Sequence, residues 1–311
     1  MRAQFAADPA SVPGIRRFVR DALHPYPAGS LADDAELCIS ELAGNAALHS
    51  GSAFVEVAVR MDSEGVTLTM SDEGSVPAEA VLPRLVMHDG QATVEPEAEA
   101  TTGRGLGIVA ALSAEWGVER TPTGKCVWAR LTGDGAIHPV RPPDLAPAPP
   151  ELRLAPDPDA LPDGWGRVLL LECPVALSLR QDEHLDELIR ELQLLASDRS
   201  SQVASEARGL LAGPANARHL GRRTALEAAA AGLTNVDIDM VAPREAGQAV
   251  LRLQELVAEA DRLCEEEQLL TLASPPELRE LRAWMAHEVS CQLATGAKPI
   301  TWTDWRAGNV D

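Results

Sequence analysis

The sequence predicts an α+β two-layer sandwich in residues 1–136, followed by a mostly α-helical bundle in residues 165–311. Three observations support this division. Residues 8–135 alternate between the apolar spacings of helices and of strands, residues 137–164 are rich in proline and follow no helical period, and the chain from Ser178 onward has helical spacing almost throughout. We therefore expect two domains joined by a semi-rigid, proline-rich linker.

Three helices are expected in the first domain. Apolar residues recur every three to four positions from Val12 onward, and those of the segment 31–50 form one stripe. A third helix is expected at 106–116, directly after a cluster of glycines. Such helices need a sheet to cover, because each has one apolar face.

The strands of the first domain are predicted from the alternation of apolar and polar residues. Segments 55–59 and 66–70 alternate in this way, and segments 118–120 and 126–131 flank a turn, so that we expect them to pair as a hairpin. The acidic segment 75–102 is expected to be a loop. The sum is a mostly antiparallel sheet with helices on one face.

The second domain is expected to begin with a short apolar strand at 167–173 and to continue with four amphipathic helices. Their expected ranges are 179–196, 201–231, 244–266 and 275–293. Four amphipathic helices favour a bundle. No catalytic motif stands out there, so we expect an interaction or dimerisation module, and a sensory domain that binds a small ligand is the second interpretation.

The formal net charge of −20 disfavours nucleic acids and anionic membranes as direct partners, because both would be repelled. The five cysteines lie far apart and show no metal-ligand spacing, as is typical of free thiols in a reducing compartment. The chain contains no apolar run of about 18 residues. We therefore expect a cytoplasmic protein.

The expected second helix carries Glu41 and Asn45, which are four positions apart and so share one face. An Asn side-chain oxygen can bind Mg²⁺. A carboxylate one turn away can deprotonate an attacking hydroxyl. By themselves, the two residues are more typical of a solvated helix face.

Asp72-Glu73-Gly74 directly follows an expected strand. An Asp at a strand end can accept a hydrogen bond from an adenine amino group, and a glycine lets the ring approach the backbone. The same three residues are also a common turn. Alone, this segment therefore favours no ligand.

Gly103-Arg104-Gly105-Leu106-Gly107 opens an expected helix. Free N–H groups and the helix dipole at such a terminus favour phosphate, and an Arg can add a charge-assisted contact. A dinucleotide-binding βαβ motif would need a strand directly before the glycines, and a long polar loop stands there instead.

The order of these segments is more specific than any one of them. A Glu-x-x-x-Asn helix, a strand ending in Asp-x-Gly, a long loop, a Gly-x-Gly-x-Gly helix and a last strand after a glycine turn resemble the GHKL ATP-binding fold. The stretch Ser40–Ser50 resembles the N box of actinobacterial anti-sigma-factor serine kinases, Gly103–Val109 their second glycine box, and Gly124–Leu131 their terminal strand. The resemblance covers residues 8–135.

The resemblance implies that Asn45 binds Mg²⁺ and that Glu41 is the general base for a serine of a partner protein. Asp72 and Gly74 would bind adenine, and residues 75–102 would form a lid. The residues implied around the ATP phosphates are Gly103, Arg104, Gly105, Leu106 and Gly107. The implied partners are a STAS-domain anti-anti-sigma protein, a sigma factor, or both, and relatives are often homodimers.

The chain departs from the family pattern at Gly44 and Cys126, where Thr is frequent, and in its acidic lid. These departures are compatible with ATP binding. They leave open a second interpretation, a nucleotide-dependent protein-interaction switch with little or no kinase activity, whose helical half binds a different partner.

A third interpretation is an atypical histidine kinase, because the segment around His287 faintly resembles a phospho-acceptor box. In such kinases the His helix precedes the ATP domain, whereas here it follows. We therefore expect His287 and His184 to be ordinary surface residues. Arg218, Arg222 and Arg223 are expected to form a solvated face, with anion binding as the alternative.

Overall fold

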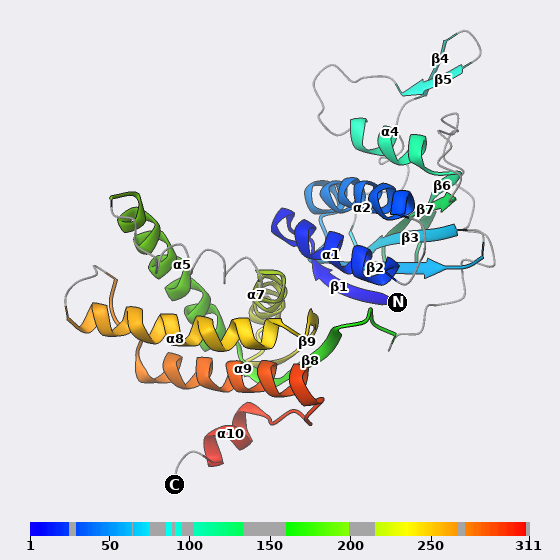
Figure 1. Ribbon diagram of the computed structural model, residues 1–311. Helices are drawn as coiled ribbons and strands as arrows, with labels where there is room; N and C mark the ends of the chain where they lie inside the picture. The colour runs from blue at the N-terminus through cyan, green and yellow to red at the C-terminus, as the bar shows by residue number, and fades with distance from the viewer. Residues whose placement is uncertain are drawn as a thin grey trace. The chain divides into compact units, whose positions relative to one another are not determined.

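The computed structural model describes residues 1–24, 29–63, 65–74, 85–88, 91–94, 103–132, 160–198, 215–266 and 271–308. The chain divides into two compact units, Met1–Asp163 and Gly164–Asp311 (Figure 1). Most of the expected linker at 137–164 lies outside the described residues, so its boundaries stay a prediction. No helix in the described part of the chain is long and apolar enough to cross a membrane.

A five-stranded antiparallel sheet forms the centre of the first unit, in the order β1-β2-β3-β7-β6. The strands are β1 (Arg2–Ala6), β2 (Phe54–Met61), β3 (Gly65–Asp72), β6 (Glu115–Arg120) and β7 (Lys125–Thr132). The predicted alternation in β2 and β3 and the β6–β7 hairpin are confirmed. The edge strand β1 was not predicted, although its buried Ala3 and Phe5 alternate with exposed or half-buried residues.

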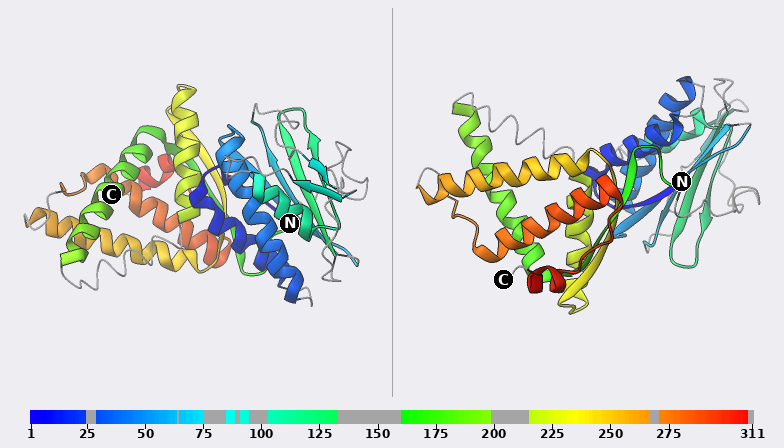
Figure 2. Two further views of the ribbon diagram at one scale, coloured as in Figure 1. Left: turned by 90° about the horizontal axis from the view of Figure 1, so that it is seen from above. Right: turned by 60° about the horizontal axis from the view of Figure 1, so that its bottom comes forward.

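Three helices cover one face of this sheet, as Figures 1 and 2 show: α1 (Val12–Leu23), α2 (Gly29–His49) and α4 (Gly103–Leu112). The predicted positions of α1 and α2 are confirmed. The third helix ends earlier than predicted, and Trp116 lies in β6. The reason is strand pairing, because the N–H of Ala114 already donates to the carbonyl of Arg130 in β7. Within the expected loop 75–102, β4 (Leu85–His88) pairs with β5 (Gln91–Val94).

The second unit combines helices with a two-stranded antiparallel ribbon of β8 (Trp165–Pro174) and β9 (Asn235–Pro243). Its described helices are α5 (Val175–Asp198), α7 (Ala215–Ala230), α8 (Ala246–Glu265), α9 (Pro276–Thr295) and α10 (Trp302–Gly308). The predictions of a largely helical unit and of the strand β8 are confirmed. The prediction of a helical bundle is not confirmed. Helix α9 packs on α8 and on β8, and α7 packs on β9. Strand β9 and helix α10 were missed, and the expected helix 201–231 is described only from residue 215.

Helix α9 holds the second unit together through one aromatic and one amide side chain. Trp284 is fully buried and donates from Nε1 to the carbonyl of Ile300 at 3.0 Å. The amide of Gln292 bonds the backbone of Leu169 in β8 twice, accepting from its N–H at 2.8 Å and donating to its carbonyl at 2.9 Å. Gln292 thus substitutes for a neighbouring strand at this point of β8.

A buried charge cluster joins α5, α8 and α9. Asp261 is 4% exposed, accepts from the N–H of Ser274 at 2.7 Å and from Arg282 at 2.9 Å, and lies 3.8 Å from His184. Burial alone would raise the pKa of the Asp261 carboxyl, but hydrogen bonds from His184 and Ser274 and the charge of Arg282 bring it well below its ordinary value. The expectation that His184 is a surface residue is wrong, because its ring bonds the Ser274 hydroxyl inside this cluster.

We predict that Leu281→Ala lowers the free energy of unfolding of the second unit by about 2–5 kcal/mol, because Leu281 is fully buried in α9 and its removal leaves a cavity. The same substitution at Leu272, which is 84% exposed, should change it by less than about 0.5 kcal/mol. Denaturant titration of the full chain, followed by tryptophan fluorescence, measures both. Equal effects of the two substitutions would show that Leu281 is not a core residue.

The depressed pKa of Asp261 also predicts a pH dependence. A carboxyl whose pKa is lower in the folded than in the unfolded chain stabilises the fold above the unfolded pKa, and this stabilisation is lost as the pH falls below about 4. Asp261→Asn should therefore destabilise the protein at pH 7 by about 3–5 kcal/mol. It should also flatten the decline in stability between pH 4 and pH 2, measured by thermal unfolding. If the stability of the variant declines between pH 4 and pH 2 as steeply as that of the natural chain, Asp261 does not cause this decline.

Candidate functional site

The first feature of the site is the contact between α2 and the start of α4. Glu41 and Asn45 lie one turn apart in α2. A Cβ placed on Gly105 of α4 would lie 2.5 Å from Oε2 of Glu41 and 3.4 Å from Nδ2 of Asn45. The two sequence motifs that were predicted to act together are therefore in direct contact.

Asn45 carries a polar atom without a partner. Its Nδ2 is buried and forms no hydrogen bond with the residues that the structure describes. Buried polar groups are almost always hydrogen-bonded, so an exception of this kind points to a ligand. Rotation of the amide by half a turn exchanges its nitrogen and oxygen, so the same position can present Oδ1 to a cation.

The second feature is a buried ion pair at the end of β3. Asp72 is 5% exposed, and Lys125, its register partner at the start of β7, is 3% exposed. Lys125 Nζ lies 3.1 Å from Oδ1 and 3.0 Å from Oδ2 of Asp72. The N–H of Gly74 also donates to Oδ1, at 3.0 Å. Sequence reasoning found Asp72 and Gly74 but missed Lys125, whose only signal was its place directly after Gly124.

Two glycines allow the backbone to close around this ion pair. A Cβ on Gly74 would collide with the carbonyl oxygen of Ser50, directly after α2, and a Cβ on Gly124 would collide with the carbonyl oxygen of Asp72. Both obstacles are backbone atoms and cannot swing aside. The end of α2, the end of β3 and the turn before β7 therefore meet here only because neither residue has a side chain.

The family comparison agrees with this arrangement. Residues 5–131 match the family model of the histidine kinase-like ATPase domain. The match spans strands β2, β3 and β6, most of β7 and the described helices α1, α2 and α4, and covers less than half of the chain. It supports an ATP-binding regulatory function for this unit. No curated relative matches the chain.

The geometry of the first unit fits the nucleotide that the matched family implies. A carboxylate has about four acceptor positions. The contacts of Lys125 and Gly74 with Asp72 occupy three, so that one acceptor remains for the amino group of adenine. The unpartnered Nδ2 of Asn45, or Oδ1 after rotation of the amide, fits a magnesium-bound phosphate. The described site thus has a free acceptor for the base and a free polar atom for the metal.

Some predicted site residues are placed only in part. The backbones of Gly103 and Arg104 begin α4, but their side-chain surroundings lie outside the described residues, as does most of the expected lid. Leu106 is 4% exposed, so its side chain belongs to the core and only its backbone N–H is available to phosphate. The roles of all these residues stay predictions.

Cysteine and histidine chemistry is disfavoured. Burial raises the pKa of the Cys126 thiol to about 11 and that of Cys38 to about 12, so both thiols are protonated and unreactive near neutral pH. His287 in α9 is half-buried, with its ring 5.1 Å from that of Trp305. This partial exposure is compatible with the expected surface position of His287. Among the described residues, no cluster of three or more His, Cys, Asp or Glu side chains could hold a metal by itself.

We predict that Gly105→Ala weakens Mg-ATP binding at least tenfold, because its methyl group would displace the Glu41 carboxylate and crowd Asn45, the predicted magnesium ligand. Gly44→Ala is the matched control: Gly44 adjoins Asn45 in α2, and its Cβ would meet nothing within 4 Å. Gly44→Ala should leave the affinity unchanged and stabilise the helix by about 0.5–1 kcal/mol. Isothermal titration calorimetry of the two full-length variants measures the affinities, and equal affinities would contradict the proposed contact.

Proposed function

We propose that this protein is an ATP-dependent serine kinase of the anti-sigma-factor type, which phosphorylates a serine of a STAS-domain antagonist, sequesters a sigma factor, or does both. The observation that carries the proposal is the contact of Gly105 with Glu41 and Asn45. It brings a carboxylate, a free amide and the N-terminus of a helix to one point. That combination suits phosphoryl transfer, which needs positioning and charge neutralisation more than covalent chemistry.

In this proposal each group has a separate task. When bound, ATP supplies the phosphoryl group, and its Mg²⁺ ion neutralises the negative charge of the phosphates. Asn45 holds the magnesium, and the free N–H groups at the start of α4 orient the phosphates. Asp72 and Gly74 bind the adenine ring. Glu41 accepts the proton of the attacking serine hydroxyl and so increases its nucleophilicity.

The second candidate is a nucleotide-dependent interaction switch with little kinase activity. The Asp72–Lys125 pair favours it, because the acceptor for adenine is already neutralised by a buried cation. Gly44 and Cys126, which replace the Thr frequent in kinases of this type, favour it as well. In either case we place the protein in the cytoplasm, where its proposed partners are found, and we expect a homodimer.

We predict that Glu41→Gln abolishes phosphoryl transfer to a STAS-domain substrate and changes Mg-ATP affinity by less than about threefold, because the amide keeps the shape and loses the basicity. Glu115→Gln, at an exposed position of β6, is the matched control and should leave both quantities unchanged. Transfer is followed with radiolabelled ATP. Undiminished transfer by Glu41→Gln would exclude Glu41 as the base.

The partners are tested by a pull-down from the native cytoplasm in Mg-ATP, read by mass spectrometry. The control bait is the Asn45→Ala variant, which should no longer bind Mg-ATP. Recovery of a STAS protein or sigma factor with the natural chain but not with the control supports the kinase proposal. If the partners recovered are of other classes and bind both baits equally, the kinase proposal is wrong and the helical unit determines the interaction.

A further inference from the structure

The second unit contains a pocket of about 170 Å³ between the β-ribbon and four helices, α5, α7, α8 and α9. Its walls are mainly apolar, with side chains that include Leu170, Ile238, Met240, Leu253 and Val289. A cavity of about 150 Å³ accepts a benzene-sized molecule. A pocket of this size and character is therefore the default candidate for a small-molecule site.

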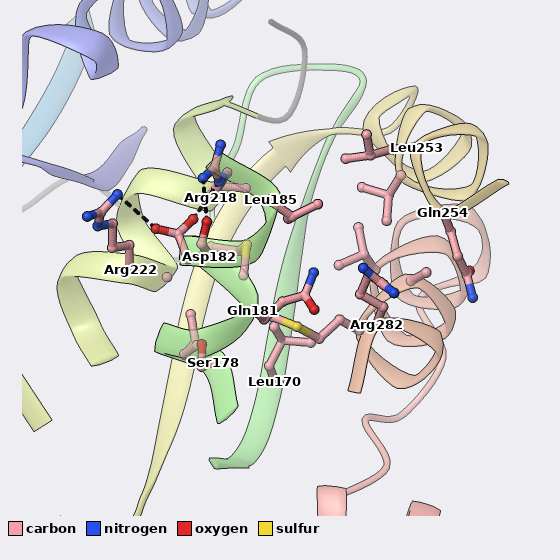
Figure 3. A pocket seen from close by; sticks show the side chains of 18 of the residues that line it. Leu170, Ser178, Gln181, Asp182, Leu185, Arg218, Arg222, Leu253, Gln254 and Arg282 are labelled. Atoms are coloured by element: carbon pink, nitrogen blue, oxygen red, sulfur yellow. Dashed lines mark hydrogen bonds and ion pairs between the residues drawn. The ribbon is translucent and has the colours of Figure 1, made fainter. Parts of the chain in front are cut away.

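One wall of the pocket carries a buried amide without partners. Gln181 of α5 is 5% exposed, and neither Oε1 nor Nε2 forms a hydrogen bond with any described residue. An unpaired buried polar group costs about 1–3 kcal/mol, and here a donor and an acceptor are both unpaired. The side chain lines the pocket, as Figure 3 shows, so an acceptor on a ligand placed there can pair with Nε2.

Arg282 of α9 supplies a second incompletely paired group. Its Nη2 donates to Asp261, but its buried Nη1 has no hydrogen-bond partner in the described part of the chain. Burial lowers the pKa of Arg282 although the nearby Asp261 charge raises it. The negative charge of Asp261 therefore does not fully offset the cost of burying the guanidinium. Nη1 can only donate, so its missing partner must be an acceptor, and an anion fits best.

The other charged residues of the pocket are already paired. Arg218 and Arg222 of α7 bridge to Asp182 (Figure 3). Both also contact Asp186. These pairs leave no net charge on that side. Arg222 is exposed, as expected of a solvated arginine face, whereas Arg218 is half-buried. The ion pairs weaken the alternative of an anion site at both residues. Among the described residues of the pocket, Oδ2 of Asp182 has no hydrogen bond but is held by the ion pair with Arg222, so the buried polar atoms with neither kind of partner are those of Gln181 and Nη1 of Arg282.

We propose that this pocket binds a small, mostly apolar carboxylic acid, with its carboxylate on Arg282 and Gln181 and its hydrocarbon part between the ribbon and α8. The carboxylate accepts from Arg282 Nη1 and from Gln181 Nε2. The apolar walls bury the chain, at about 0.8 kcal/mol for each buried CH₂ group. A ligand of about ten non-hydrogen atoms fits the space. This inference rests on the second unit alone and does not depend on the kinase proposal.

Octanoate is the probe, and the methionine methyl groups are the reporters. Met240 and Met285 line the pocket, whereas Met1, Met61, Met70 and Met87 belong to the first unit and serve as internal controls. In ¹³C-methyl-methionine NMR spectra of the full chain, octanoate should shift the Met240 and Met285 signals alone. Octanol, which lacks the charge, should bind about tenfold more weakly, which corresponds to about 1.4 kcal/mol.

Three substitutions separate the parts of the proposal. Gly221 of α7 lines the pocket, and a Cβ there would meet only Ile238, at 3.9 Å. Gly221→Leu should therefore fill the pocket and abolish octanoate binding, and Gly221→Ala should preserve it. Gln181→Leu should weaken octanoate about tenfold and leave octanol unchanged. The NMR spectra without ligand show whether each variant is folded.

The outcomes are distinct. If octanoate shifts none of the six methionine signals, or all of them alike, no specific site exists and the proposal is overturned. Octanoate binding that survives in folded Gly221→Leu would place the site elsewhere. If octanol binds as tightly as octanoate, or Gln181→Leu does not distinguish them, the assignment of a carboxylate is wrong.

Discussion

The first unit depends on the close backbone approach at the end of β3. The turn before β7, the carbonyl at Ser50 and the end of β3 occupy a space that admits no side chain at Gly74 or Gly124. Asp72 is enclosed there, and a buried carboxylate is unfavourable unless a cation and hydrogen bonds compensate it. Lys125 and the N–H of Gly74 do so. The position of α2 on the sheet, and with it that of Glu41 and Asn45, follows from this junction.

Both units leave polar atoms unpaired at the points where a ligand is proposed. Asn45 in the first unit and Gln181 in the second are examples, because Nδ2 of Asn45 and both amide atoms of Gln181 are buried and have no hydrogen-bond partner among the described residues. The amide of Gln292, by contrast, is paired, because it forms two hydrogen bonds with β8. Unpaired buried groups lower stability, so their presence beside open space is better explained by binding than by folding.

Some elements were predictable because their signal is local. The alternation in β2 and β3 and the helical spacing of α1 and α2 reflect one buried face each. Strand β9 has the same signal, with buried Ile238, Met240 and Ala242 at alternate positions. It was missed because its partner β8 lies some 60 residues earlier and two expected helices surrounded it. The end of α4 was missed because pairing with β7, which is not a local signal, ends the helix.

The sequence by itself determined the order of the site segments and the class of the first unit, since backbone requirements for Gly, Asp and Asn at turns and helix ends are local. It also determined that the second unit is largely helical. Only the tertiary structure decided that Lys125 neutralises Asp72, that His184 lies in a charge cluster, and that Gln181 and Arg282 line one pocket. Each of these facts joins residues distant in the chain, and the spacing of residues along a chain does not show which side chains packing brings together.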